Sequence, residues 1–315
     1  MITFDSFRND DPPKLADAWR AADLGSAALQ PMTSAALEDA VFSKPYFDRH
    51  GLVVAREGDR ILGFAHAGFG PNASRTAIDT SIGTTMLMVV PSHDRQTEIE
   101  DGLLQRAEQY LRDRGATTIL GGGGPDIGGS YLGLYGGSDL PGILDSSPRM
   151  REVFRRNGYA EHMRIAVLRR PLEGFRPPVN RLQLAIRRAT TLHVIDEPTR
   201  RSWWEAATTT GMALRRYELL GEGDALLGSA SVWDVQPLAS SWGVLIAGLL
   251  RVDIEGVRRR QGLASYLVAE AMHDLATEGM MVAEAHVDEG NAPAVRLFDK
   301  LGFRATDHGT VFRRP

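Results

Sequence analysis

The sequence predicts two consecutive domains of the α/β (α+β) class, each a twisted mixed sheet flanked by helices. Three observations support this prediction: a length of 315 residues, an internal repeat, and strands that alternate with helices in both halves. At about 100–200 residues per domain, the length suggests two domains. With 43% hydrophobic and 24% charged residues, the chain can fill a core in each.

The repeat begins with a hairpin. Residues 57–65 (EGDRILGFA) predict a strand, a tight turn and a second strand, and residues 222–230 (EGDALLGSA) predict the same arrangement. The Gly-Asp pair in each segment suits the backbone angles that a short hairpin turn requires. Both halves are therefore expected to start their sheets with antiparallel strands.

A helix with one apolar face follows the hairpin in each half. Apolar residues recur at every fourth position, which is the spacing of one helix face. In the first half they are Ile99, Leu103, Ala107 and Leu111, and in the second half Leu263, Leu267, Ala271 and Leu275. Gly115 and Gly279 are expected to end these helices, because glycine favours the C-terminal cap.

The ends of the two halves also match. Residues 153–159 and 167–171 resemble residues 297–303 and 311–315. The first half carries extra residues before its end, in a glycine-rich insertion at 121–148 that we expect to form a long loop. The predicted domains are residues 1–172 and 181–315, joined by a proline-bearing linker at 173–180.

Composition excludes several classes of function. The chain has no cysteine, which removes disulfides, zinc-thiolate sites, iron–sulfur clusters and cysteine nucleophiles, and no metal site is predicted. A net charge of −4 gives no general attraction to nucleic acid. No secretory signal and no membrane-spanning apolar run are visible, so we expect a cytoplasmic protein that does not bind membranes. The oligomeric state stays open.

A candidate anion site lies in the second half. The strand predicted at residues 249–254 leads through an arginine- and glycine-rich loop into the helix that begins near Ser265. Main-chain N–H groups and the positive end of the helix dipole then meet at one place, where a phosphate group can bind. Gly262 and Ala264 leave room for such a group to approach, and Arg258, Arg259 and Arg260 add positive charge. A well-capped surface helix is the alternative for this loop taken alone.

Two motifs of this half resemble the GNAT acyltransferase superfamily. Arg259, Gly262 and Ala264 match its pyrophosphate-binding signature (Q/R-x-x-G-x-G/A), and residues 287–303 resemble its second signature. The resemblance implies acetyl-CoA as donor, with the pyrophosphate on the N–H groups of residues 260–265 and the pantetheine arm along residues 252–254, in a gap between two strands. The residues it implies in donor binding are Val252, Ile254, Arg259, Arg260, Gln261, Gly262, Leu263, Ala264, Ser265, Asn291 and Phe298.

Three residues are candidates for the base that accepts the amine proton. On the strand predicted at 282–287, alternation sends Glu284 and His286 to one face. His286 aligns with a position where some superfamily members carry a glutamate base, and Glu284 and Asp253 are the other candidates. The superfamily often has a tyrosine acid where this chain has Phe298. Because phenylalanine cannot donate a proton, another group or solvent has to protonate the thiolate.

The first half lacks the donor-binding signature. At the corresponding positions Glu98 and Glu100 stand where a phosphate would sit, and like charge opposes its binding. We expect this domain to have lost donor binding and to help shape the acceptor pocket. The arrangement is similar to that of mycothiol synthase-like acetyltransferases. The expected function is transfer of an acetyl group to a small-molecule amine by direct attack; the alternative is a non-catalytic acyl-CoA-binding or regulatory protein.

Overall fold

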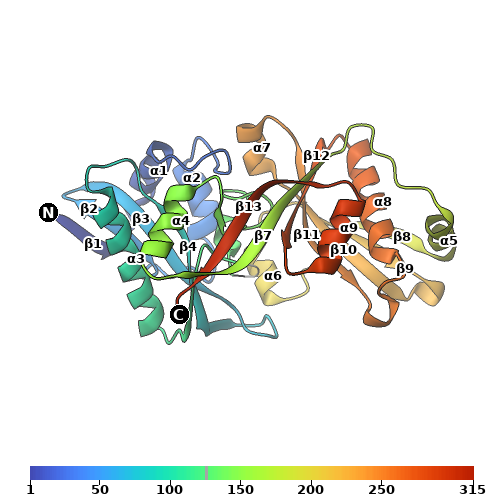
Figure 1. Cartoon of the computed structure of the whole chain (residues 1–315), viewed down its shortest axis with the longest axis horizontal. Helices are drawn as coiled ribbons and strands as arrows, with labels where there is room; N and C mark the ends of the chain where they lie inside the picture. The colour runs from blue at the N-terminus through green and yellow to red at the C-terminus, as the bar shows by residue number, and fades with distance from the viewer. Residues whose placement is uncertain (125–126) are drawn as a thin grey trace. The chain divides into compact units, whose positions relative to one another are not determined.

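The chain divides into two compact units. The structure is a computed structural model that describes residues 1–124 and 127–315 (Figure 1). Unit 1 consists of Met1–Ile165, Arg200–Thr210 and Asp307–Pro315, and unit 2 consists of Ala166–Thr199 and Gly211–Thr306. Each unit therefore includes residues from both halves of the sequence. Pro125 and Asp126, inside the predicted insertion, lie outside the described residues.

Unit 1 contains a mixed sheet with helices packed on it. Its strands are β1 (Ile2–Ser6), β2 (Leu52–Glu57), β3 (Arg60–Pro71), β4 (Ile78–Val89), β5 (Thr118–Gly121), β6 (Ile143–Leu144), and parts of β7 (Ala160–Pro171) and β13 (Arg304–Arg313). Its helices are α1 (Pro12–Ala21), α2 (Ser34–Leu37), the π-helical turn η1 (Glu38–Phe42), α3 (Gln96–Asp113), the 3-10 turn η2 (Gly129–Tyr131), α4 (Pro148–Arg156) and α6 (Trp203–Thr208). Strands β1 to β4 are antiparallel neighbours, and β5 runs parallel to β4.

Unit 2 repeats this plan. Its strands are β8 (Thr191–Asp196), β9 (Leu214–Leu220), β10 (Leu226–Asp234), β11 (Ile246–Ile254), β12 (Val282–Asp288), and the remaining parts of β7 and β13. Its helices are α5 (Arg181–Ala189), the 3-10 turns η3 (Glu222–Asp224) and η4 (Gly256–Arg258), α7 (Gln236–Trp242), α8 (Leu263–Thr277) and α9 (Ala292–Lys300). Strands β8 to β11 are antiparallel neighbours, whereas β12 runs parallel to β11. The predicted fold class, mixed sheets flanked by helices, is confirmed.

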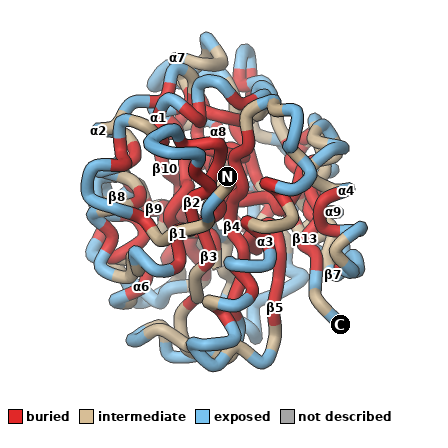
Figure 2. The backbone as a smooth tube through the Cα atoms, turned by 90° about the vertical axis from the view of Figure 1, so that its left-hand side faces the viewer, coloured by how far each residue is buried: buried red, intermediate tan, exposed pale blue. Residues whose placement is uncertain are grey.

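The predicted apolar helix faces are confirmed as the main packing surfaces. All eight residues of the two stripes are buried, four in the core under α3 and four in the core under α8. Gly115 and Gly279 follow the ends of these helices with φ angles of +98° and +94°, a conformation that side chains disfavour. Figure 2 shows the resulting core as buried backbone running through the sheet strands of unit 1.

The two predicted hairpins differ in their turns. In unit 1, Glu57 pairs with Arg60, so Gly58 and Asp59 form the tight turn that the sequence predicts. In unit 2, β9 ends at Leu220 and β10 starts at Leu226, and the 3-10 turn η3 occupies the Gly-Asp segment. The antiparallel pairing of β9 with β10 confirms the predicted hairpin, but the prediction of a tight turn is wrong, because a longer connection joins the two strands. The segment is exposed, and sequence similarity to residues 57–65 does not fix its backbone.

The predicted insertion at 121–148 packs within unit 1 over its described residues. Strand β6 pairs with Gly309 and Thr310 of β13, and Tyr131 is buried beside His66. Asp145 accepts hydrogen bonds from Arg164 at 2.8 Å and Arg151 at 2.7 Å. The insertion is thus tied to the body of unit 1 by backbone, aromatic and charged contacts.

The described residues contain no helix with the length and apolar character needed to cross a bilayer.

Burial of His66 predicts an acid-sensitive unit 1. His66 is 2% exposed, its Nδ1 lies 3.0 Å from the Tyr131 hydroxyl, and burial lowers its pKa to about 3. Between pH 6.5 and 3, His66 binds a proton in the unfolded chain but not in the folded chain. The free energy of unfolding therefore falls as the pH falls. We expect a loss of about 1.4 kcal/mol per pH unit from this group.

Urea unfolding at several pH values tests this expectation. The slope between pH 6 and 4 should be shallower in His66→Gln than in the unchanged protein. His50→Gln, which alters an exposed histidine, is the matched control and should leave the slope unchanged. Equal slopes in His66→Gln and the unchanged protein would contradict the expectation.

Candidate functional site

The loop between β11 and α8 presents unbonded main-chain N–H groups. Within residues 1–124 and 127–315, no protein group accepts a hydrogen bond from the N–H groups of residues 260–265. The first N–H of this region with a partner is that of Tyr266, which donates to the Gly262 carbonyl. Free N–H groups at the start of a 15-residue helix, together with its dipole, favour an anion at this place.

Gly262 gives the loop its shape. Its φ angle is +82°, and it occupies the N-cap position of α8. A Cβ atom at this position would lie 2.8 Å from Leu182 Cδ2. The backbone conformation therefore favours glycine, and any other residue would also have to displace the end of the Leu182 side chain of α5.

Positive charge surrounds the loop. Arg258, Arg259 and Arg260 are exposed, and the Arg259 Nε donates to the Ile254 carbonyl at 3.2 Å. That bond holds the Arg259 side chain against the end of β11. The Ser265 hydroxyl is buried and makes no hydrogen bond within the described chain.

Strands β11 and β12 separate before β11 reaches this loop. Their parallel pairing runs from Ile246–Val282 to Leu249–Ala285 and stops there, although β11 continues to Ile254 and β12 to Asp288. A β-bulge in the pairing of β10 with β11 lies at the same level, where Ser231 pairs with Arg251 and Val232 with Leu249. Bulges of this kind bend a strand and redirect its side chains. The last residues of β11 therefore leave a main-chain edge open toward β12.

One face of the unit 2 sheet is apolar and the other is polar. Ala283, Ala285 and Val287 of β12 belong to the core under α8 and α9, so Glu284 and His286 point to the opposite face. The side chains of Ser229 and Ser231 on β10 are also buried outside that core. The polar face is thus the side of the sheet on which proton transfer is chemically reasonable.

Glu284 and His286 lie together on this polar face. Glu284 is fully buried, and its Oε2 accepts a hydrogen bond from the Arg169 Nε at 2.6 Å. The His286 Nε2 lies 3.3 Å from the Glu284 Oε1. Neither ring nitrogen of His286 makes a hydrogen bond within the described residues, and its side chain is 5% exposed. A buried carboxylate next to an imidazole without other partners is suited to accepting a proton.

Arg169 completes this group and was not predicted from sequence. It belongs to β7, the neighbour of β12, and its guanidinium lies 4.1 Å from the centre of the Trp242 ring. Sequence reasoning missed it because Arg169 is far from Glu284 along the chain. Only the strand order brings the two together.

Loss of the Arg169 side chain is expected to destabilise the protein. Arg169→Met leaves a carboxylate buried without its cation, and we expect the free energy of unfolding to fall by about 3 kcal/mol. Arg251→Met is the matched control, because Arg251 pairs with Asp253 at the surface and such pairs contribute less than about 1 kcal/mol. Urea unfolding measures both, and equal effects of the two substitutions would contradict the assigned role of Arg169.

The other predicted residues are placed as follows. Asp253 is about half exposed and pairs with Arg251, apart from the buried pair. Val252 and Ile254 pack against the unit 2 core. The Asn291 Oδ1 accepts a hydrogen bond from the Ala294 N–H at 3.2 Å and so caps α9. Phe298 is buried, with its ring 5.0 Å from that of Phe303. Their roles in donor binding stay predictions.

The corresponding helix start in unit 1 is different. The Arg95 N–H donates to the His93 Nδ1 at 3.0 Å, and the Gln96 N–H donates to the His93 carbonyl at 3.0 Å. Two N–H groups at the start of α3 are therefore already bonded within the protein. Glu98 pairs with Arg95 at 2.6 Å, which places negative charge in the first turn of the helix.

The expected position of Glu100 in the phosphate cradle is wrong. Its side chain is 1% exposed and pairs with Arg149 at 2.7 Å and Arg156 at 2.8 Å, between α3 and α4. Burial of this carboxylate is a packing feature of unit 1. Occupied N–H groups and the Glu98–Arg95 pair, rather than two carboxylates, distinguish this helix start from that of α8.

Comparison with known proteins identifies the fold. Residues 243–312 match a family model described as FR47-like protein. No curated protein matched the sequence. Among solved structures, the chain is similar to a tandem GNAT protein from the clavulanic acid biosynthesis pathway, with a TM-score of 0.68, 14% identity, and coverage of 99% of this chain and 98% of that one.

Two further structures support the same fold. One is a GCN5-related glucosamine N-acetyltransferase region of a fungal multi-domain β-N-acetylglucosaminidase, with a TM-score of 0.73, 15% identity and 99% of this chain covered, but only 38% of that one. The other is a GCN5-related N-acetyltransferase from Sphaerobacter thermophilus, with a TM-score of 0.64, 16% identity, and 100% and 96% of the two chains covered. The fold is thus the tandem GNAT fold that the sequence motifs indicate.

Proposed function

We propose that this chain is an N-acetyltransferase whose unit 2 binds acetyl-CoA and transfers the acetyl group to the amine of a small molecule. The observation that carries the proposal is the coincidence of two features in one unit. Unbonded N–H groups at residues 260–265 follow the end of β11, whose last residues have already separated from β12. The first feature suits a diphosphate, and the second suits an extended chain that forms hydrogen bonds along an open strand edge.

Three parts of unit 2 hold the proposed donor. The N–H groups of residues 260–265 and the loop arginines bind the pyrophosphate. The open edge of residues 252–254 takes the pantetheine arm, and Asn291 and Phe298 lie on its far side. The thioester then reaches the polar face of the sheet, where Glu284 and His286 lie 3.3 Å apart.

The proposed reaction is direct attack of the amine on the thioester carbonyl. A bond forms from nitrogen to the carbonyl carbon, the bond from carbon to sulfur breaks, and the amine loses a proton. His286 accepts this proton, and the neighbouring Glu284 stabilises the resulting imidazolium, while Arg169 fixes the carboxylate from its other oxygen. Solvent protonates the departing thiolate, because Phe298 cannot.

A thiol-release assay tests the proposal. Full-length protein is incubated with acetyl-CoA and a panel of amines comprising an amino sugar, an amino acid, a polyamine and a peptide with a free N-terminus. We expect release with at least one acceptor class. His286→Gln should lower kcat by about 100-fold, the scale of general-base catalysis, without changing the Kd of acetyl-CoA.

A second candidate function is acyl-CoA binding without turnover. The GNAT superfamily, which this chain resembles, often has a tyrosine acid at the position of Phe298. Because phenylalanine cannot donate a proton, Phe298 favours this alternative. Acetyl-CoA that binds, as measured by calorimetry, but gives no thiol release with any amine would support it and contradict the proposed transfer. Absence of both binding and release would contradict both functions.

We further propose that the protein acts in the cytoplasm.

A further inference from the structure

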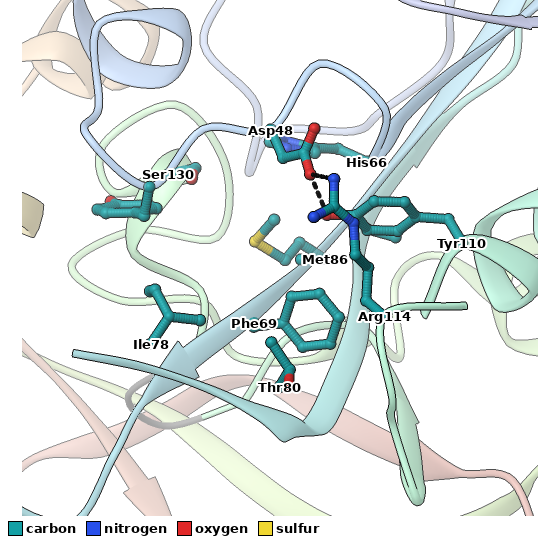
Figure 3. Close-up of a pocket in the computed structure, with 12 residues that line it drawn as sticks. Asp48, His66, Phe69, Ile78, Thr80, Met86, Tyr110, Arg114 and Ser130 are labelled. Carbon is teal, nitrogen blue, oxygen red and sulfur yellow. Dashed lines mark hydrogen bonds and ion pairs between the residues drawn. The ribbon is translucent and has the colours of Figure 1, made fainter. Parts of the chain in front are cut away.

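Unit 1 contains a cavity that the proposed transfer reaction does not use. Its volume is about 180 Å³, and it lies between β3, β4, α3, the segment before β2 and the turn η2 (Figure 3). We call it the unit 1 cavity. Its wall includes Phe69, Ile78 and Met86, which supply apolar surface. An engineered cavity of about 150 Å³ with apolar walls binds benzene in another protein, so the size suits a ligand with a single ring.

The strand pairing explains why space remains here. Strand β2 begins at Leu52, which pairs with His66, and the last bond of this segment to β3 is the one that the Ala67 N–H donates to the Gly51 carbonyl at 2.8 Å. Gly68 adds room, because a Cβ at this position would lie 2.9 Å from the Met86 Cε. The Met86 side chain can therefore extend into the cavity, as Figure 3 shows.

Two buried hydroxyl groups face this cavity. The Tyr46 hydroxyl and the Ser130 Oγ are both fully buried and lie close to each other, but within residues 1–124 and 127–315 neither has a partner with hydrogen-bond geometry. Such groups are rare in folded proteins, because a buried donor or acceptor without a hydrogen-bond partner lowers the stability of the fold. Because the two hydroxyls lie close together in the wall of one cavity, a single bridging hydroxyl of a ligand can satisfy both.

Neighbouring residues hold these hydroxyls in place. The Tyr46 ring lies 4.6 Å from that of Trp204 on α6. A Cβ at Gly129, next to Ser130, would lie 2.4 Å from Cγ2 of Thr208, which also belongs to α6. Helix α6 therefore packs against the start of η2 as well. The hydroxyls are thus presented by packed side chains and not by a free loop.

The charged groups around the cavity balance one another. Asp48 pairs with Arg114 and accepts a hydrogen bond from the Tyr110 hydroxyl at 3.1 Å, as the dashed lines in Figure 3 show. His66 is neutral above pH 3, because burial lowers its pKa to about 3. Among the described residues that line the cavity, no unpaired charge is therefore available to compensate a charged ligand that leaves water.

We propose that the unit 1 cavity binds a small neutral alcohol or phenol. The ligand hydroxyl bridges Tyr46 and Ser130, donating to one and accepting from the other, and the carbon skeleton packs against Phe69, Ile78 and Met86. Unit 1 then has a ligand site of its own, separate from donor binding in unit 2. The inference rests on unit 1 alone and stands whether or not unit 2 transfers acetyl groups.

Fluorine NMR on the full-length protein tests the proposal with three probes of similar shape. The probes are 4-fluorophenol, fluorobenzene, which lacks the hydroxyl, and 4-fluorobenzoate, which carries a charge. We expect 4-fluorophenol to bind at least 10-fold more tightly than either of the others. Absence of 4-fluorophenol binding, which would mean a cavity that holds water only, would overturn the proposal, as would equal binding of fluorobenzene.

Two substitutions locate the binding site. Tyr46→Phe and Ser130→Ala each remove one oxygen, and each should weaken 4-fluorophenol binding at least 5-fold while leaving fluorobenzene binding unchanged. Tyr159→Phe removes a buried hydroxyl of unit 1 outside the cavity and should change neither. Thermal unfolding confirms that each variant is folded, and if one is not, the other decides. Unchanged 4-fluorophenol binding in the folded variants would overturn the proposal.

Discussion

Gly262→Glu is expected to abolish the binding of acetyl-CoA, with a Kd at least 100-fold higher by calorimetry. Three effects act together. The φ angle of +82° is unfavourable for any side chain, a Cβ would lie 2.8 Å from Leu182, and the added carboxylate repels a diphosphate at the helix start. Displacement of the loop also moves the N–H groups that are expected to bind the pyrophosphate.

Gly256 offers a matched control in the same loop. It has no atom within 4 Å of an added Cβ, and its φ angle is not in the left-handed region. Gly256→Ala should change the Kd less than 2-fold, whereas Gly262→Ala should raise it about 10-fold through strain and the contact with Leu182. Thermal unfolding separates loss of binding from loss of folding. Unchanged affinity in folded Gly262→Glu would show that the donor binds elsewhere.

Separate expression of the two sequence halves is expected to give unfolded proteins. Residues 173–315 lack Ala166 and Leu168 of β7, which belong to the core of unit 2, as well as Arg169. Residues 1–172 lack Asp307–Pro315, which belong to unit 1 and contain the buried Val311 and Phe312. Each half would thus expose the core that its missing strand covers.

Circular dichroism and hydrogen exchange of the two fragments measure this effect. The fragments 1–172 and 173–315 together contain every strand, and co-expression should restore folded protein. A cooperative unfolding transition in either half alone would contradict the expectation.

Phe312→Ala tests the same point within the intact chain. Phe312 is fully buried and stacks on Phe154 with a ring separation of 5.5 Å. Its truncation should lower the free energy of unfolding by about 3–5 kcal/mol and increase hydrogen exchange in α3 rather than in α8. The adjacent exposed residue gives the control, since Arg313→Ala should cost less than about 0.5 kcal/mol.

Local patterns predicted the parts of the fold that depend on periodicity. The stripe Ile99, Leu103, Ala107 and Leu111 defines a helix face, and the structure buries that face completely. The Gly-Asp turn after Glu57 was also predictable, because two residues between paired strands leave few backbone solutions. The similar segment after Glu222 was not, because its longer connection is exposed and weakly constrained.

The candidate site was predictable only in its local part. The loop arginines, Gly262 and the alternation of Glu284 and His286 are all features of short segments. Arg169 was not predictable, because its contact with Glu284 depends on which strand lies beside β12. The buried position of Glu100 could likewise not be predicted, because it depends on two arginines of α4 that sequence spacing does not connect to α3.

The contribution of Asp307–Pro315 to unit 1 has a consequence for synthesis of the protein. Domains at the beginning of a chain generally fold while the ribosome is still extending it. Met1–Ile165 of unit 1 are made before unit 2, yet the sheet of unit 1 includes residues from Asp307–Pro315, which are made after it. The nascent N-terminal part of unit 1 therefore stays incompletely covered until Asp307–Pro315 have been synthesised and have left the ribosome.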